Sequence, residues 1–444
     1  MRRLAGAALL ALASQSLPAQ SFVGDAAVDS ASAARAASGR AAAARRAGNL
    51  ALARDEAARA SSAWPSQPAY ALSWAAAAAR AGDTVSVLRA LGQVAALGVG
   101  RDLGPDSLFA PYRSAPGFRA VEHALRQNAE PLVRSRVRAT LADSTFWPEG
   151  LDHDSRTGRV YVSSVRHGAI VELSPDGATR ELWPRGGGPR GAVLAVRVDA
   201  GRGVLWATVS GVPQMEGYLP ADSAIGALLR VRLADGVVER RWDLPVVQGG
   251  HVLGDIAVSG GGDVFVTDSR EAVLYRLRAG ADTMESTRHP LLRSPQGMAL
   301  TPDARVLYVA DYSHGIVRVD LTTRAMTRVD DASNSTSLGC DGIAWTEGAI
   351  VAVQNGVAPA RVVRFPLDAD GRRFLRADVL DRSAVVADEP TSLVIIGRDV
   401  VYVANSQWEK YAANGKPLSG SVLRPPVLLA VPLPAADPTT PAPR

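Results

Sequence analysis

The chain of 444 residues contains a single cysteine, Cys340. One thiol cannot form a disulfide within the chain, so the fold has to be held together by its packed core. Lysine is almost as scarce, since it occurs only at Lys410 and Lys416, and the other basic side chains are arginines spread along the sequence. The net charge of +5 is therefore not gathered into a basic patch, which argues against binding of nucleic acid.

Several catalytic signatures are missing as well. The sequence has no Gly-rich phosphate loop, no nucleophile elbow and no histidine pair with zinc-ligand spacing. These absences argue against nucleotide-binding, serine-hydrolase and zinc-protease functions. After the N-terminal region, no segment is long and apolar enough for a membrane helix, so we expect no membrane span.

The first residues have the layout of a secretory signal peptide. Met1-Arg2-Arg3 carry positive charge, and Leu4 to Leu12 form a short apolar stretch that leads to Leu17-Pro18-Ala19. Such a stretch is too short to span a bilayer, and we expect cleavage after Ala19. The sequence predicts a signal peptide over residues 1–19 and an exported protein, periplasmic or extracellular.

One pattern is repeated along most of the chain. An acidic or amide residue, usually followed by Gly, precedes a short apolar run, a polar turn and an aliphatic strand that ends in Ser, Asp or Asn. The copies are Glu149-Gly150-Leu151 to Ser164, Gly254-Asp255-Ile256 to Asp268, Gln296-Gly297-Met298 to Asp311, Asp341-Gly342-Ile343 to Val353, Glu389-Pro390-Thr391 to Asn405, and a weaker copy, Leu194-Ala195-Val196 to Thr208. Six copies at intervals of about 40 to 60 residues predict a mainly β fold, a six-bladed β-propeller.

The two ends of the propeller are predicted to meet. The last blade has only one clear strand after Asn405, Val427 to Leu433, and a Pro-rich tail follows over residues 434–444. Ser135 to Leu141, just before the first copy, alternates Arg with Val, Ala and Leu. We expect this segment to complete the last blade, so that no sheet edge is left exposed. The propeller would then span residues 135–433.

Residues 35–130 have a different composition. Alanine-rich stretches, Ala41 to Ser62 and Ala69 to Ala81, are separated by prolines, and Ala is the best helix former. We therefore expect short antiparallel helical hairpins. Two similar segments that start at Arg46 and Arg80 are 34 residues apart, which is the tetratricopeptide period. The sequence predicts a small N-terminal α-helical, tetratricopeptide-like domain, which either binds a peptide or protein partner or packs on the propeller as a cap.

Three segments of the propeller resemble one known family. They are Phe146-Trp147-Pro148-Glu149-Gly150-Leu151, Ser294-Pro295-Gln296-Gly297-Met298-Ala299-Leu300-Thr301-Pro302-Asp303 and Gly339-Cys340-Asp341-Gly342-Ile343-Ala344. They are similar to the regucalcin and gluconolactonase family, the senescence-marker-protein propellers, over about residues 135–433. In that family a divalent cation lies on the propeller axis, held by a Glu that opens the first blade, by Asn residues that open later blades and by an Asp.

The resemblance assigns metal ligands by position. Glu149 matches the family's Glu and Asp341 its Asp, whereas Gln296 stands where Asn is usual. Gly254 stands at the other Asn position, with Asp255 beside it. With a further carboxylate from the last blade, the candidate metal ligands are Glu149, Gln296, Asp341, Asp255 and Glu389. Carboxylate and amide oxygens suit a hard cation, so we expect one divalent cation, preferably Ca²⁺, with Mg²⁺, Mn²⁺ or Zn²⁺ as alternatives.

Four further residues are candidates for binding substrate. His167, His251 and His314 fall in loops that should open on the same face as the blade-opening acids, where a His can bind substrate or carry protons. Each of them neighbours a Gly, so a plain turn position is the alternative. The longest late loop, from Ser406 to Pro426, can cover the same face and bring Trp408 to the ligand.

Two functions fit these residues. The first is a metal-dependent hydrolase of a sugar lactone or related ester, in which the cation polarises the carbonyl and Asp341 takes a proton from the attacking water. The second is a non-catalytic scaffold that binds a small molecule, peptide or protein. An axial cation with open coordination positions favours the hydrolase, and an axis filled by side chains favours the scaffold.

Overall fold

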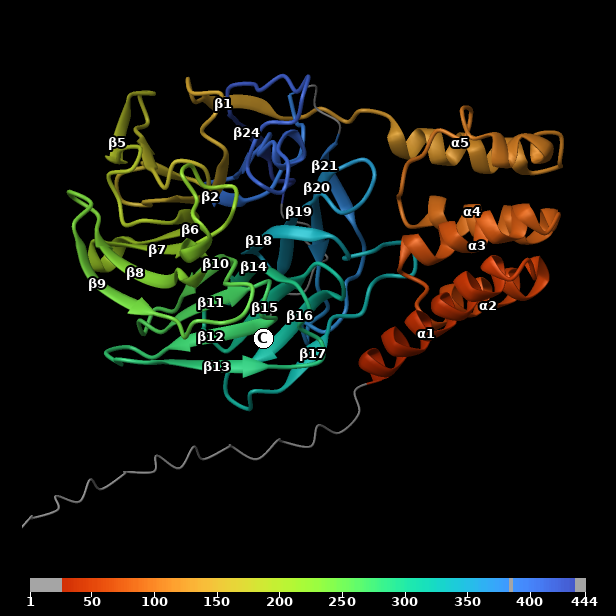
Figure 1. The fold of residues 1–444 in the computed structure, drawn as a ribbon, viewed down its shortest axis with the longest axis horizontal. Helices are drawn as coiled ribbons and strands as arrows, with labels where there is room; N and C mark the ends of the chain where they lie inside the picture. The colour runs from red at the N-terminus through yellow and green to blue at the C-terminus, as the bar shows by residue number, and fades with distance from the viewer. Residues whose placement is uncertain (1–25, 383–385, 436–444) are drawn as a thin grey trace, which may run out of the picture.

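The computed structural model describes residues 26–382 and 386–435. The predicted signal peptide lies outside the described residues, and so does most of the Pro-rich tail. Figure 1 shows a group of helices beside six sheets arranged around an axis. The predicted fold class is confirmed, because the chain is a mainly β six-bladed propeller preceded by a small helical part.

Each blade is a four-stranded antiparallel sheet. Blade I contains β2 (Pro148–His153), β3 (Val160–Ser164), β4 (Ile170–Leu173) and β5 (Thr179–Trp183), and blade II contains β6 (Ala192–Asp199), β7 (Val204–Ser210), β8 (Gly226–Arg232) and β9 (Val238–Asp243). Blade III contains β10 (Leu253–Val258), β11 (Val264–Asp268), β12 (Val273–Leu277) and β13 (Met284–Arg288), and blade IV contains β14 (Pro295–Leu300), β15 (Val306–Asp311), β16 (Gly315–Asp320) and β17 (Met326–Arg328). Blade V contains β18 (Cys340–Thr346), β19 (Ala349–Gln354), β20 (Arg361–Pro366) and β21 (Asp378–Arg382), and blade VI contains β22 (Leu393–Ile396), β23 (Asp399–Val403), β24 (Val427–Pro432) and β1 (Arg136–Thr140).

The core of the propeller is divided among the interfaces between blades. Blades I and II share a buried cluster with Ile170 and Leu205, and blades V and VI share one with Val353 and Tyr402. Every other pair of neighbours has a cluster of the same kind. Burial of apolar surface therefore stabilises pairs of blades rather than single blades, and the ring depends on its own closure.

The ring closes where the two ends of the propeller meet in blade VI. Strand β1 pairs with β24 in antiparallel register, with Arg136 opposite Ala430 and Thr140 opposite Val427. The backbone N–H of Leu141 also donates to the carbonyl of Pro426 at 2.9 Å. The closure expected from the sequence is confirmed, and β1 takes the outer edge of the sheet.

A chain that starts at residue 142 is expected to melt at a markedly lower temperature than one that starts at residue 131. Both truncations lack the helices, but only the first lacks β1 and so leaves β24 as an unpaired edge. Differential scanning calorimetry of the two truncated proteins tests the point. Equal melting temperatures would contradict the role of β1 in closing the ring.

Between residue 26 and the propeller, the structure describes five α-helices. They are α1 (Ala26–Arg46), α2 (Leu50–Ala63), α3 (Pro68–Arg80), α4 (Thr84–Ala96) and α5 (Phe118–Ala129), with the 3₁₀ turn η1 (Ser107–Tyr112) before α5. The alanine-rich stretch from residue 41 to 62 is not one helix, because Gly48 takes a φ of 75° and the side chain of Asn49 caps α2. A separate core around Trp74, Leu91 and Phe118 holds these helices together.

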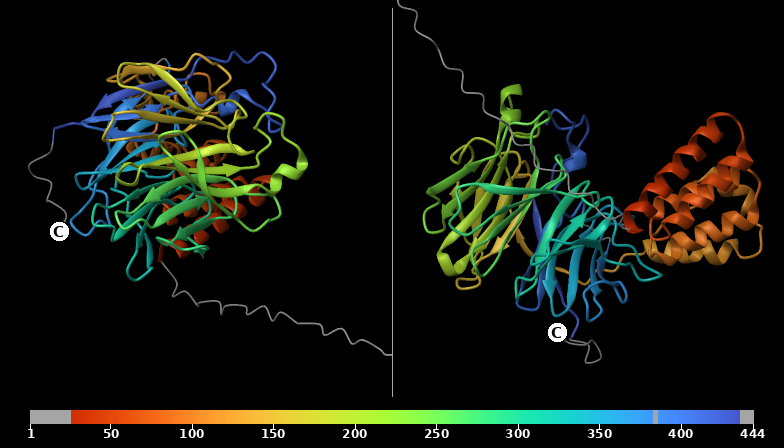
Figure 2. Two further views of the ribbon diagram at one scale, coloured as in Figure 1. Left: turned by 90° about the vertical axis from the view of Figure 1, so that its left-hand side faces the viewer. Right: turned by 90° about the horizontal axis from the view of Figure 1, so that it is seen from below.

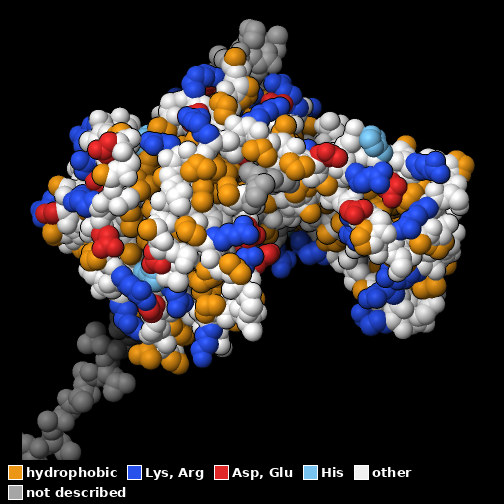
Figure 3. Space-filling model, turned by 90° about the horizontal axis from the view of Figure 1, so that it is seen from above, with side chains coloured by type: hydrophobic (Ala, Val, Ile, Leu, Met, Phe, Trp, Pro, Cys, Tyr) orange, Lys and Arg blue, Asp and Glu red, His pale blue; other side chains and the backbone are white. Residues whose placement is uncertain are grey.

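The helices pack against the loops of blades IV and V. Trp64 stacks on His314 with ring centroids 5.7 Å apart, and Arg361 donates to the carbonyl of Gly98 at 2.8 Å. Because Pro295 at the start of β14 pairs with Asp311 at the end of β15, the turn that carries His314 lies at the same end of blade IV as the start of the inner strand. The helical part therefore contacts the face on which the inner strands begin (Figure 2), and a notch separates it from the rest of the propeller (Figure 3).

Three further 3₁₀ turns lie in the propeller: η2 (Ala200–Arg202), η3 (Pro220–Ala224) and η4 (Trp408–Lys410). Within the described part of the chain, no helix has both the length and the apolar character needed to cross a membrane.

Candidate functional site

The starts of the inner strands bring carboxylates together at one end of the propeller axis. Neighbouring inner strands pack against one another around the ring, and Glu149 and Asp341 are the second residues of β2 and β18. Burial raises the pKa of Glu149 well above its usual range; the negative charges of Asp341 and Glu389 add to this effect, and the Trp408 N–H opposes it. Burial also raises the pKa of Asp341 to about 7. Carboxylates from blades I, V and VI thus lie close enough to disfavour one another's ionisation.

Asn355 holds the carboxylate of Asp341 in place. It lies just after β19, and its side-chain Nδ2 donates to Oδ2 of Asp341 and to the carbonyl of Pro390, each at 2.9 Å. The two bonds tie blade V to the segment that opens blade VI. The bond to Asp341 also favours the ionised form of its carboxyl group, against the larger effect of burial.

The late loop, residues 404–426, lies over the carboxylates and is called the strap below. Trp408 donates its indole N–H to Oε2 of Glu149 at 2.8 Å, and the backbone N–H of Glu409 donates to Oε2 of Glu389 at 3.0 Å. Trp408 meets the ring of Trp147 edge-on, with centroids 4.8 Å apart. The strap therefore supplies a donor to each of two axial carboxylates, and Trp408 contacts the predicted site.

Glu389 is half-buried beneath the strap. Burial raises the pKa of its carboxyl to about 7, with smaller contributions from the charges of Glu409, Asp388 and Asp341, while the backbone N–H of Glu409 lowers it. The same surroundings thus disfavour ionisation of Glu389 and Asp341 near neutral pH.

Left-handed backbone conformations gather around these carboxylates. Trp147 has a φ of 51°, Glu389 of 69° and Gln407 of 68°. Trp147 lies two residues before Glu149, and Gln407 directly precedes Trp408. Such conformations cost about 1–3 kcal/mol each for residues other than Gly, and they persist where the surrounding structure imposes them. The backbone is therefore strained at the points that aim the axial side chains.

Gln296 and Gly254, the two departures from the family pattern, lie next to each other. A Cβ atom on residue 254 would lie 3.4 Å from Oε1 of Gln296. The Gln side chain, which is longer than the usual Asn, therefore extends toward Gly254. Its Nε2 donates to the hydroxyl of Ser294 at 3.1 Å, which turns the oxygen away from that serine. Gln296 therefore offers an amide oxygen over the opening of blade III.

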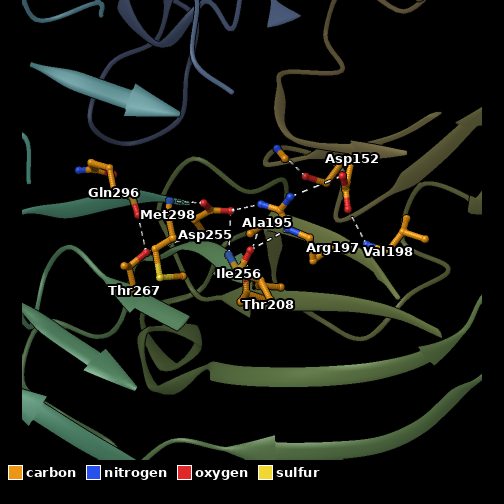
Figure 4. Close-up of polar contacts among 12 residues, drawn as sticks. Asp152, Ala195, Arg197, Val198, Thr208, Asp255, Ile256, Thr267, Gln296 and Met298 are labelled. Carbon is orange, nitrogen blue, oxygen red and sulfur yellow. Dashed lines mark hydrogen bonds and ion pairs between the residues drawn. The ribbon is translucent and has the colours of Figure 1, made fainter. Parts of the chain in front are cut away.

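Asp255 has a different set of contacts. Its carboxylate accepts the N–H of Met298 at 2.6 Å and faces Arg197 at 3.4 Å, and Arg197 also faces Asp152 at 3.5 Å (Figure 4). Burial raises the pKa of Asp255, and Arg197 opposes this effect. The residues Asp152, Arg197 and Asp255 link the inner strands of blades I, II and III. The role of Asp255 as a metal ligand stays a prediction, because the N–H of Met298 and the side chain of Arg197 compete with a cation for its carboxylate.

The three histidines are not brought together. His251 is buried and uses both ring nitrogens, on Asp268 at 2.6 Å and on the carbonyl of Pro245 at 2.9 Å. Nε2 of His167 lies 3.1 Å from Asp143, in the loop before blade I. His314 is covered by Trp64 of the helical part. Their predicted role in binding substrate remains untested, and the structure gives each one a separate packing role.

Two residues at the site were missed by the sequence interpretation. One is Asn355. The other is Tyr312, at the turn after β15. Burial and the charges of Asp341 and Glu389 raise its pKa to about 12, which indicates that Tyr312 belongs to the site. Both follow the second strand of a blade, where polar residues such as Asp311 cap turns by accepting backbone N–H groups. Asn355 lies one residue beyond Gln354, which pairs with Cys340 as Asp311 pairs with Pro295, so the repeat does not mark it.

Comparison with known proteins identifies the family. The profile described as the SMP-30/Gluconolactonase/LRE-like region matches residues 147–401, more than half of the chain. The chain belongs to this family. None of the curated proteins matches its sequence.

Three solved structures to which this chain is similar are a regucalcin, a gluconolactonase and a virginiamycin B lyase. A regucalcin from Agrobacterium tumefaciens, described as a calcium-binding protein, is 17% identical, with 67% of this chain and 96% of that chain covered at a TM-score of 0.46. A gluconolactonase from Xanthomonas campestris is 16% identical, with 68% and 97% covered at a TM-score of 0.45. A virginiamycin B lyase from Staphylococcus aureus is 16% identical, with 60% and 81% covered at a TM-score of 0.44.

Proposed function

We propose that this protein is a divalent-cation-dependent hydrolase of a lactone or a related ester, with its site at the axial carboxylates. The observation that carries the proposal is that Glu149 and Asp341, which open blades I and V, lie close enough for the charge of Asp341 to raise the pKa of Glu149. Membership of the SMP-30/gluconolactonase family supports the reaction class. Sugar lactones are the substrate class that the family resemblance favours.

The donors at the axis suit a hard cation. Glu149 and Asp341 supply carboxylate oxygens and Gln296 an amide oxygen, and a bound cation would offset the repulsion that the charge of Asp341 exerts on Glu149. Among residues 26–382 and 386–435, no three His, Cys, Asp or Glu side chains form a metal-binding group, so amide oxygens have to complete the set. Oxygen donors favour Ca²⁺ or Mg²⁺ over Zn²⁺.

The chain's own residues would divide the remaining work. When bound, a divalent cation supplies Lewis acidity toward the carbonyl oxygen of an ester. Asp341, whose carboxylate is held in place by Asn355, would take a proton from the attacking water. The water oxygen would then bond to the carbonyl carbon, the ring C–O bond would break, and the proton would pass to the departing oxygen. Trp408 and Tyr312 would border the substrate.

A calorimetric titration followed by a lactone panel tests the proposal. We expect one Ca²⁺ or Mg²⁺ to bind per chain, and lactone hydrolysis followed by pH-stat to stop when the cation is chelated. A folded protein that binds no divalent cation and opens no lactone would contradict the proposal. The expected signal peptide would make this an exported enzyme, which fractionation of the producing cells tests.

A non-catalytic binding protein is the second candidate, and one observation favours it. Helices α1, α2 and α3 border a groove of about 270 Å³ lined by alanines, Tyr70 and the side chains of Arg45 and Arg80. The two arginines would complement an acidic peptide. Binding of such a peptide by a protein without cation affinity would favour this candidate.

A further inference from the structure

Asn355 has a side-chain oxygen without a partner beside Asp341. Its Nδ2 faces two groups that can only accept, the Asp341 carboxylate and the Pro390 carbonyl, each at 2.9 Å. The amide orientation is therefore fixed, because exchanging nitrogen and oxygen would place three acceptors together. Its Oδ1 is buried and, among the described residues, has no donor. A buried acceptor that lacks a donor costs about 1–3 kcal/mol.

A second asparagine that follows the second strand of a blade shows the difference. Asn405 also follows the second strand of its blade, and its Nδ2 also donates to a proline carbonyl, that of Pro425, at 3.1 Å. Its Oδ1, however, accepts the backbone N–H of Val427 at 2.8 Å. Asn405 is thus a satisfied turn residue, whereas Asn355 donates to Asp341 and its oxygen has no donor among the described residues.

Backbone mobility around Asn355 does not explain why its oxygen has no partner. The preceding residue, Gln354, is fully buried and donates to the carbonyls of Thr336 and Leu338, each at 2.8 Å. It also accepts a hydrogen bond from Arg361 at 2.6 Å. The backbone that carries Asn355 is therefore held on both sides, and its side chain is positioned rather than mobile.

We propose that Asn355 is a further ligand of the axial cation, which it binds through Oδ1 while its Nδ2 holds Asp341. The inference rests on the proposed function and adds a residue outside the expected ligand set. A neutral amide oxygen adds a ligand without adding charge to carboxylates that already repel one another. It also supplies one of the six to eight oxygens that Ca²⁺ takes.

Three variants of the full chain separate the ligand from a structural residue. Asn355→Leu removes both amide functions at similar size, Asn355→Asp keeps an oxygen at the position but loses the donor to Asp341, and Asn405→Leu is the matched control. Ca²⁺ affinity is measured by calorimetric titration, and thermal melting in chelator establishes that each variant is folded. Asn355→Ser, a smaller polar residue, replaces Asn355→Leu if that variant does not fold.

We expect Asn355→Leu to weaken Ca²⁺ binding by about 10- to 100-fold, and Asn355→Asp to bind within about threefold of the unaltered protein or more tightly. Asn405→Leu should lower the melting temperature, and it should weaken Ca²⁺ binding much less than Asn355→Leu does. Equal loss in Asn355→Leu and Asn355→Asp would overturn the ligand role, because it would show that only the bond to Asp341 matters. Unchanged affinity in both would overturn the inference alone, whereas absence of Ca²⁺ binding by the unaltered protein would overturn the proposed function as well.

Discussion

Replacing Asp341 by Asn is expected to lower kcat/KM for lactone hydrolysis by at least about 100-fold, the usual contribution of a general base. The substitution keeps the size of the side chain but removes its charge and its capacity to take a proton. It should also weaken cation binding by at least about tenfold, because the number of charged ligands sets affinity at such sites. Glu149→Gln should reduce cation affinity similarly. Titration calorimetry and pH-stat assays measure both effects.

The matched control for Asp341→Asn is Asp255→Asn. Asp255 is also a carboxylate near the start of an inner strand, but it faces Arg197 and accepts backbone N–H groups from Met298 and Ile256. Its replacement should lower the melting temperature and leave cation affinity within about threefold, since its oxygens are already engaged. Equal cation affinity and equal turnover in the unaltered protein, Glu149→Gln and Asp341→Asn would contradict the proposed axial cation site. That result would favour the non-catalytic binding scaffold.

Raising the pH from 5 to 8 in chelator is expected to destabilise the unaltered protein. The pKa values of Asp341 and Glu389 are both raised to about 7, whereas both groups release their protons near pH 4 in the unfolded chain. Between these values the native state binds more protons than the unfolded state, so the free energy of unfolding falls as pH rises. Ca²⁺ added at pH 8 should restore several degrees of melting temperature, because it binds only the folded protein.

The double variant Asp341→Asn, Glu389→Gln is the control for this pH effect. His251 has a raised pKa and contributes a slope of the same sign, so the informative quantity is the difference between the two proteins. In chelator the variant should lose less melting temperature between pH 5 and pH 8, and it should gain little from Ca²⁺. The same pH slope in both proteins would show that these carboxyl groups do not cause it.

The strap sets a condition on ligand entry. Trp408 donates to Glu149 and Glu409 to Glu389, so two axial carboxylates are already hydrogen-bonded from above. A cation that binds Glu149 has to use the lone pairs of the carboxylate that the indole N–H leaves free. The left-handed φ of 68° at Gln407 places strain at the start of this turn, where a change of backbone conformation would release it.

The sequence alone determined the architecture of the propeller. Six copies of an acid-or-amide, Gly and strand pattern fix where each blade opens, because a four-stranded sheet must bury both faces against its neighbours. The missing strand after Val427 to Leu433 also indicated that residues 135–141 close the ring, as β1 does. Glu149 and Asp341 could be placed at one axis for the same reason, since equivalent positions of the repeat point to a common centre.

Only the tertiary structure decided which other side chains reach that axis. In the sequence, Asp255, Gln296 and Glu389 are all candidate ligands near the start of an inner strand. In the structure, Asp255 faces Arg197, whereas the side chain of Gln296 extends toward Gly254. Asn355 and the strap lie outside the repeat, so no periodic pattern marks them. Their contacts join residues up to 263 positions apart, as in the bond from Gln407 to Ser144, and depend on how whole blades and loops pack. Local sequence specifies strands and turns, but the partner of a polar side chain is set by that packing.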